Sequence, residues 1–174
     1  AGITRYTLAR WFGPLLLEKL NFHIPAIDLK LEIAFCGKSK TLSAFLDTGN
    51  MLKEPFSGSP VAVAAYPGVR ELLPPEVCSF LSSSKTMDWN LLEKALTGIN
   101  NAARFCLIPY RSLHGEGFLL GFRPEKVTLW QKGRSFTFIK KIIIGVQREQ
   151  ISPDAEYEVL LPLELWRCAG REEG

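Results

Sequence analysis

The segment Leu42–Asn50, LSAFLDTGN, decides how the rest of the sequence is interpreted. An apolar run brings Asp47 to the edge of the predicted core, and the turn Thr48-Gly49 follows at once. Glycine allows a tight turn and close backbone packing, and the small hydroxyl of Thr48 can hydrogen-bond within the loop. Two interpretations follow: Asp47 is a catalytic aspartate, or it is the end of a strand that continues into a loop.

Strands are predicted on both sides of this segment. Apolar and polar residues alternate over Ile27–Phe35, which is the pattern of a half-buried strand. Gly37–Lys40 predicts a hairpin turn and Thr41–Leu46 the returning strand. A loop is expected at Pro55–Pro60 and a short buried strand at Val61–Ala65.

The middle of the chain changes from strand to helix. Short helical turns are expected over Val69–Leu81, and Asp88 is a candidate N-cap for a helix over Trp89–Thr97. We therefore predict a helical insertion at residues 69–98, followed by further strands and a C-terminal helix. The predicted ranges are Arg104–Tyr110, Gly117–Phe122, Lys126–Gln131, Ser135–Ile144 and, for a strand that runs into the helix, Tyr157–Trp166.

Composition limits the class of protein. The 174 residues are 47% hydrophobic and 22% charged, which is typical of a soluble globular domain. No apolar run reaches about 18 residues, the length that a membrane span needs. Because the first residue is Ala rather than Met, we expect a fragment or a processed product of a longer protein. Residues 1–24 are expected to be a separate N-terminal segment and residues 25–174 the folded domain.

Cysteine and histidine are too scattered to predict a metal site. The four cysteines contain no CxxC pair and the two histidines lie far apart, so we expect reduced cysteines and no metal. Cys106 and His114 share one predicted strand and loop, but no third group is evident that would orient a Cys–His nucleophile.

Paired carboxylates can hydrolyse an amide without any of these groups. Two close carboxylates cannot both ionise, so they share a proton, and one activates a bound water while the other acts as acid. The sequence has one Asp-Thr-Gly, and Asp28, Asp88 and Asp154 lack its context. We therefore expect a homodimer in which each chain contributes Asp47 at a two-fold axis, with Thr48 hydrogen-bonding across it.

The chain resembles the aspartic peptidases of the retroviral type. These carry a hydrophobic strand, then Asp-Thr-Gly, and later a hydrophobic-hydrophobic-Gly strand that braces the catalytic loop. Asp47-Thr48-Gly49 and Ile143-Ile144-Gly145 match the two elements. The resemblance implies a mainly β fold, a retropepsin-like acid-protease closed β-barrel, in which Thr48, Gly49, Asn50 and Gly145 support the active-site loop.

Two longer pieces are similar to a narrower family, the sporulation sigma-E factor processing peptidases of endospore-forming bacteria. The pieces are FLDTGNMLKEPFSGSPV and CLIPYRSLHGEGFLLGFRPEKV, and the resemblance covers most of residues 27–165. Asn50 fits the Asp-Thr-Gly-Asn pattern of this family.

That resemblance implies the activity and its setting. An aspartic endopeptidase without a cofactor would activate a sporulation sigma factor by removing its pro-sequence, and a signalling protein made in the forespore would trigger it. The full-length protein would reside in the cell membrane through an N-terminal region missing here. This domain would lie in the mother-cell cytoplasm.

A mobile cover over the site is expected from a hairpin tip. Arg111–Gly117 is polar, contains glycine and lies between two predicted strands, so Leu113, His114 and Gly115 are the candidate flap. An ordinary surface hairpin fits the same residues. Pro55–Pro60 could line the pocket or be a structural loop.

Two rival functions come from other classes. Residues 104–148 carry a net charge of +7 with interleaved aromatics, and residues 149–174 a net charge of −5. This pattern fits a basic and aromatic β-barrel binding module without catalytic activity. It also fits solvated strand faces and an acidic tail, and we expect no nucleic-acid partner. The second rival is a peptidase-like fold kept for dimerisation or scaffolding.

Overall fold

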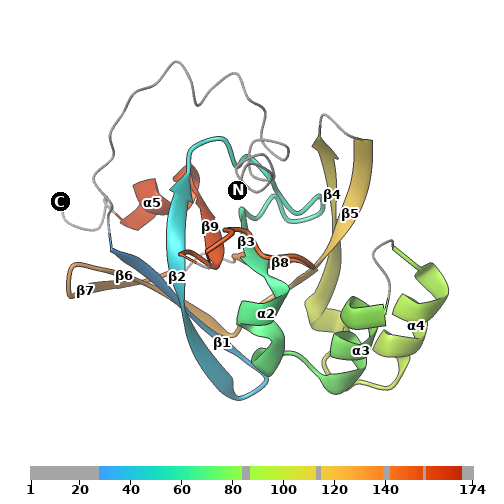
Figure 1. The fold of residues 1–174 in the computed structure, drawn as a ribbon. Helices are drawn as coiled ribbons and strands as arrows, with labels where there is room; N and C mark the ends of the chain where they lie inside the picture. Colours follow the sequence, from blue (N-terminus) through green and yellow to red (C-terminus); the bar gives the residue numbers. More distant parts are fainter. Residues whose placement is uncertain (1–27, 84–86, 113–114, 139–141, 155, 170–174) are drawn as a thin grey trace.

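The computed structural model describes residues 28–83, 87–112, 115–138, 142–154 and 156–169. Strands predominate in these ranges, so the mainly β prediction is confirmed (Figure 1). The strands are β1 Leu29–Phe35, β2 Lys38–Asp47, β3 Val61–Ala65, β4 Phe105–Ser112, β5 Gly115–Phe122, β6 Lys126–Gln131, β7 Arg134–Thr137, β8 Ile143–Gln147 and β9 Val159–Pro162. The helices are α2 Tyr66–Val69, α3 Pro75–Ser83, α4 Trp89–Thr97 and α5 Leu163–Ala169, with short 3-10 helices η1 Arg70–Leu72 and η2 Ala102–Arg104.

The nine strands form one sheet in the order β4-β5-β8-β3-β9-β2-β1-β6-β7. The sheet is open, so the prediction of a closed barrel was wrong. Its edge strands β4 and β7 lie on opposite sides of the molecule (Figure 1). Neither edge is suited to closure, because β4 contains Pro109, which has no N–H to donate, and β7 has only four residues.

The first hairpin is tighter than the sequence predicted. β1 and β2 pair antiparallel from Phe35 and Lys38 outward. The two residues between them, Cys36 and Gly37, have φ angles of 52° and 72°, as a two-residue hairpin turn requires. The alternation of β1 is confirmed: Leu29, Leu31, Ile33 and Phe35 are buried, while Ile27 lies outside the described residues.

The helical insertion covers one face of the sheet. The predicted helix after Asp88 is confirmed, since its carboxylate accepts hydrogen bonds from Asn90 N and Leu91 N at 3.0 and 3.1 Å. Arg148, at the end of β8, donates to the carbonyl of Leu81 at 2.8 Å and so holds the last turn of α3. The buried residues of the insertion join those of β1 and β6 in the main core. The predicted C-terminal helix is confirmed as α5.

The strand predicted over Ser135–Ile144 is two strands in different places. β7 pairs with β6 at one edge, whereas β8 pairs with β3 and β5 inside the sheet. Periodicity could not separate them, because an exposed edge strand and a buried inner strand follow each other closely in the sequence.

No helix in the described ranges has both the length and the apolar character that crossing a bilayer requires.

A second, smaller cluster lies on the other side of the central strands. In β3, Val61 and Val63 belong to this cluster while Ala62 and Ala64 belong to the main core, so alternate residues face opposite sides. The other buried members are Ala65, Ile108, Leu119, Ile143, Ile151 and Leu160.

Gly121 of β5 allows the hairpin to pack on this cluster. A methyl group there would lie 2.5 Å from Ile108 Cδ1 and 3.0 Å from Ile143 Cγ2. We expect Gly121→Ala to lower the free energy of unfolding by about 1–3 kcal/mol, because the packed side chains must shift. Denaturant unfolding measures the change. Gly98→Ala is the control, since nothing lies within 4 Å of its added methyl, and equal effects of the two variants would contradict the packing account.

Candidate active site

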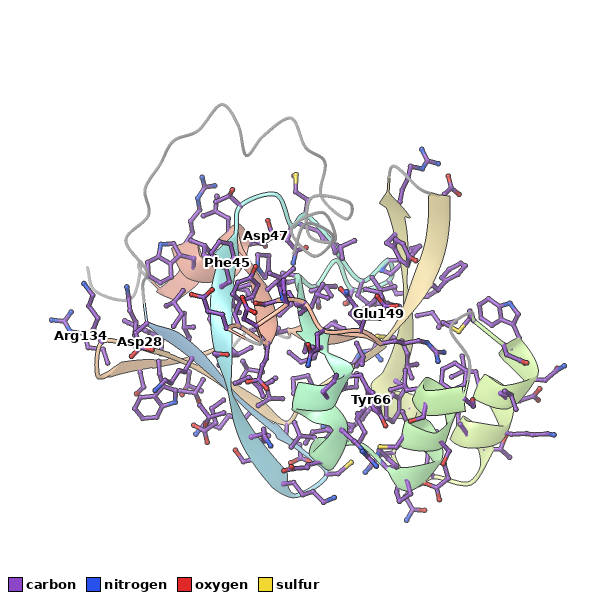
Figure 2. All side chains as sticks on the ribbon, in the orientation of Figure 1. Asp28, Phe45, Asp47, Tyr66, Arg134 and Glu149 are labelled. Atoms are coloured by element: carbon purple, nitrogen blue, oxygen red, sulfur yellow. The ribbon has the colours of Figure 1, made fainter. Side chains whose placement is uncertain are left out.

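Asp47 is the last residue of β2, at the start of the loop that leads to β3 (Figure 2). Leu42 and Ala44 of this strand are buried in the main core. Alternation therefore directs Phe45 and Asp47 to the other face, where Phe45 is 47% exposed. The strand end predicted for Asp47 is confirmed.

The neighbour that braces the Asp47 turn is β9. β2 and β9 run parallel, with Ala44 opposite Val159 and Asp47 opposite Pro162. Helix α5 begins at the next residue, Leu163. Because a parallel partner followed directly by a helix fixes the end of β2 from the side, the turn has a rigid support.

The two carboxylate oxygens of Asp47 have different surroundings. Oδ1 accepts a hydrogen bond from Gly49 N at 2.9 Å, and the turn is closed by Asn50 N, which donates to the Asp47 carbonyl at 3.2 Å. Oδ2 is buried and has no hydrogen-bond partner among the residues that the structure describes. One oxygen is thus held in place by the turn, while the other has no hydrogen bond among the described residues.

Burial raises the pKa of Asp47, against the opposing effect of hydrogen bonds from the backbone of Gly49 and Asn50. The charged form is disfavoured because the carboxylate has lost water. A carboxyl group whose pKa is raised can carry a proton at less acidic pH than an ordinary aspartate.

Tyr157 borders the site and was not predicted from the sequence. Its ring stacks on Phe45 with centroids 4.9 Å apart. Burial raises the pKa of Tyr157, and the nearby charges of Glu156 and Asp47 raise it further. Tyr157 lies 110 positions after Asp47 in the chain, so only the tertiary structure could reveal this contact.

Asn50 anchors the loop after the turn, and its side chain is only 3% exposed. Its Nδ2 donates to the carbonyl of Val61 at 3.0 Å and its Oδ1 accepts from Leu52 N at 3.1 Å. The Asn50 side chain therefore links the first half of the loop to Val61, the first residue of β3.

Thr48 and Gly49 are exposed. Thr48 lines a groove of about 440 Å³ between the loop and α5. Met51, Pro60, Leu163 and Arg167 also line it, so the predicted loop at Pro55–Pro60 contributes its last residue to this groove. A hydrogen bond of Thr48 across a two-fold axis remains a prediction.

Gly145 lies away from the Asp47 turn. It belongs to β8, which β3 and β9 separate from β2 in the sheet. A methyl group at Gly145 would lie 3.1 Å from Val61, 3.3 Å from Ile108 and 3.4 Å from Leu119. The glycine thus lets the β4–β5 hairpin approach β3. The strand beside β2 is β9, with Leu160, Leu161 and Pro162 opposite Phe45, Leu46 and Asp47. The sequence suggested Ile143-Ile144-Gly145 for this position.

The candidate flap lies at the tip of the hairpin of β4 and β5. Their register runs from Phe105 opposite Phe122 to Ser112 opposite Gly115, so a hairpin is confirmed at this point. Leu113 and His114 lie outside the described residues, and Gly115 opens β5. The role of this tip as a flap stays a prediction.

Cys106 is a poor candidate nucleophile. Burial raises the pKa of its thiol to about 11, so the thiol stays protonated at neutral pH and is a weak nucleophile. Among the described residues no group of three or more His, Cys, Asp or Glu is placed to hold a metal ion.

Comparison with known proteins gives a consistent result. Residues 3–165 match the peptidase U4 family, described as sporulation factor SpoIIGA. A protein described as a sporulation sigma factor-processing peptidase, from Bacillus thuringiensis subsp. kurstaki, is 25% identical over 83% of this chain and 87% of its own length. The sporulation sigma-E factor-processing peptidase of Priestia megaterium is 22% identical over 90% of this chain, which spans 50% of that protein. No solved structure matches the chain.

The raised pKa of Asp47 predicts a pH-dependent stability. Because the folded chain binds this proton more tightly than the unfolded chain, the cost of burying the carboxylate is absent at low pH and present above the pKa of the folded state. We expect Asp47→Asn to raise the melting temperature at pH 7. The difference should disappear below the ordinary pKa of an aspartate, about 3.9. Thermal unfolding of both proteins across this range measures it, and a difference independent of pH would contradict the assignment.

Proposed function

The chain belongs to the peptidase U4 family of sporulation factor SpoIIGA, and from this premise we propose that it is an aspartic endopeptidase with Asp47 as its catalytic residue. Peptidase activity itself follows from the family and its named members. The observation that supports the catalytic assignment is the Asp47 carboxyl group at the end of β2. One of its oxygens is fixed by Gly49 N, the other is buried without a partner, and its pKa is raised.

The proposed site is completed by a second copy of the chain. In the proton-sharing mechanism one carboxylate activates the water while the other, protonated, acts as the acid, so two carboxyl groups are needed at the same time. Two Asp47 side chains facing each other would share one proton and hold the attacking water between them. The active form in this proposal is a homodimer with one aspartate per subunit, each half-site being a retropepsin-like arrangement of β2, its turn and the bracing strand β9.

The proposed substrate is an inactive sigma factor whose pro-sequence is removed. Both relatives are named as sigma factor-processing peptidases. We assign the peptidase domain to residues 25–174 and residues 1–24 to the segment that joins it to a membrane region. For the whole protein we propose a place in the cell membrane, with this domain in the mother-cell cytoplasm and a signalling protein made in the forespore as activator.

Replacing Asp47 tests the catalytic assignment. Asp47→Asn and Asp47→Ala are each expected to reduce cleavage of a pro-sigma factor by at least about a thousandfold, because the residual rate lacks the proton-sharing pair. The measurement is appearance of the shortened sigma factor on gels. Asp88→Asn is the matched control, since asparagine caps a helix nearly as well as aspartate. Cleavage that survives in both Asp47 variants would overturn the assignment.

Dilution tests the shared site. If each active site needs two chains, specific activity should fall as the protein concentration drops below the dimer dissociation constant. Activity and sedimentation are measured on the same dilution series. An inactive Asp47→Asn chain added in excess should also reduce the activity of the unmodified chain through mixed dimers. A monomer with full specific activity would contradict the homodimer.

A further inference from the structure

The loop between Asp47 and β3 contains a second carboxylate, that of Glu54, which has no exposed surface. Residues 54–59 form a closed turn around it. Glu54 N donates to the Ser59 carbonyl and Gly58 N to the Glu54 carbonyl, each at 2.9 Å. Gly58 has a φ of 65°, which glycine adopts without steric cost. The backbone is therefore closed before any side chain is considered.

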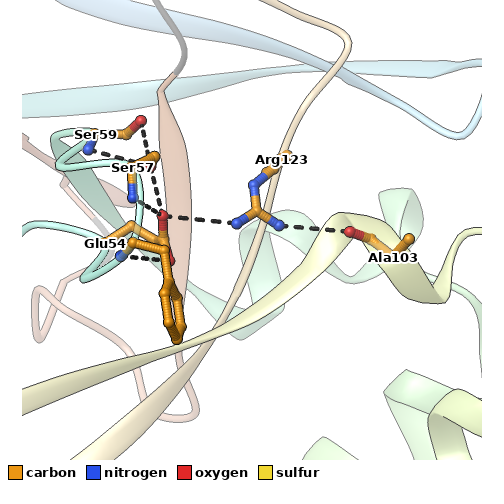
Figure 3. Close-up of polar contacts among 6 residues, drawn as sticks. Glu54, Ser57, Ser59, Ala103 and Arg123 are labelled. Carbon is orange, nitrogen blue, oxygen red and sulfur yellow. Dashed lines mark hydrogen bonds and ion pairs between the residues drawn. The ribbon is translucent and has the colours of Figure 1, made fainter.

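The Glu54 carboxylate accepts hydrogen bonds from this same turn (Figure 3). Phe56 N donates to Oε1 at 3.2 Å, and Ser57 N donates to Oε2 at 2.8 Å. The Ser57 hydroxyl also donates to Oε2 and is the main reason that the pKa of Glu54 is lowered despite burial. Because these donors stabilise the charged form, Glu54 is a buried anion at neutral pH.

This anion reaches the hairpin through Arg123. Arg123 Nη2 lies 3.6 Å from Glu54 Oε2, and its Nη1 donates to the carbonyl of Ala103 at 3.4 Å (Figure 3). The backbone of Arg123, directly after β5, donates to the carbonyl of Arg104 at 2.8 Å. Ala103 and Arg104 lead into β4, so Arg123 closes the base of the hairpin and contacts Glu54 at the same time.

We propose that Glu54 is a positioning residue, which together with Arg123 clamps the loop of the Asp47 turn to the base of the β4–β5 hairpin. The inference rests on the proposed function. In that proposal the hairpin covers the bound peptide, and the clamp sets the position of the Asp47 turn relative to the hairpin. Asn50 holds the first half of the loop to β3, and Glu54 holds the second half to the hairpin. The carboxylate of Glu54 acts on Asp47 through the loop, since its partners are Phe56, Ser57 and Arg123.

A positional role fits the chemistry of the pair better than a role in stability alone. Well-packed apolar side chains often stabilise an interior as much as a buried ion pair does. The ion pair fixes one point of the loop against one point of the hairpin, because the Glu54 carboxylate is held by its own turn and Arg123 Nη1 donates to the Ala103 carbonyl. The contact between the two segments thus depends on the geometry of both partners as well as on burial.

Two substitutions distinguish the hydrogen bonds inside the turn of Glu54 from its contact with the hairpin. Glu54→Gln places an amide N–H₂ where Oε2 or Oε1 now accepts, so at least one donor of the turn loses its acceptor. Arg123→Gln leaves the hydrogen bonds inside the turn intact and removes the contact between loop and hairpin, together with the bond of Arg123 Nη1 to the Ala103 carbonyl at the hairpin base. We expect each to lower kcat for pro-sigma factor cleavage by about tenfold with a smaller change in KM. The double variant should lose less than the product of the two single losses, because both break the same contact.

Hydrogen exchange gives a second measurement that does not depend on activity. In the purified chain, Arg123→Gln should speed amide exchange both in residues 48–60 and in residues 104–123, because the two segments no longer restrain each other. Lys40→Gln is the matched control. It removes an ion pair to Glu71, 3.0 Å long, between β2 and η1, and should leave kcat and exchange in both segments unchanged.

The outcomes distinguish the clamp from the proposed function. Folded Glu54→Gln and Arg123→Gln variants with unchanged kcat and unchanged exchange would overturn the clamp. So would activity losses in both variants that only match the fraction of unfolded protein, since Glu54 would then be structural. If Asp47→Asn retained cleavage, the proposed function would fail, yet joint acceleration of exchange in loop and hairpin would still support the clamp.

Discussion

The parallel pairing of β2 with β9 is the constraint on which the rest of the structure depends. About 110 residues separate the two strands in the sequence, and Glu158, directly before β9, connects them where their pairing begins. Its backbone N donates to the Ser43 carbonyl at 2.9 Å, and its carbonyl accepts from Ala65 N at 2.9 Å. Its side chain accepts from Ser43 N at 3.3 Å. One residue thus links β2, β3 and the start of β9, and the helical insertion and the β4–β5 hairpin belong to the segment of chain that this pairing closes into a loop.

The loop between Asp47 and β3 buries more polar groups than a connecting loop needs. Asn50, Glu54 and Ser59 are buried polar residues within ten positions of one another. Asn50 and Glu54 have their side-chain oxygens satisfied by backbone donors. In contrast, Asp47 Oδ2 has no partner among the described residues. Since buried polar atoms are nearly always paired, this unsatisfied oxygen sets Asp47 apart from the two satisfied side chains that follow it in the loop.

The two faces of the central strands have different roles. One face packs on the helical insertion and forms the main core, while the other carries the smaller cluster with Phe45, Asp47 and Tyr157 at its border. Glycines at 121 and 145 let the hairpin approach this second face. In the open sheet, β4 lies at one edge and β7 at the other, and within the described residues the two edges do not pair with each other.

The sequence alone was sufficient for features that depend on neighbouring residues. Alternation in β1, the strand that ends at Asp47, the cap at Asp88 and the turn after Asp47 reflect local preferences of backbone and side chain, and Asp47 could be selected as the candidate from them. The tertiary structure decided which distant strands pair. It placed β9, rather than Ile143-Ile144-Gly145, beside β2, and it showed an open sheet in place of the predicted barrel. It also brought Tyr157 to Phe45 and Arg123 to Glu54. Short apolar strands such as these have similar patterns, so their partners are chosen by burial over the whole chain, which no local pattern records.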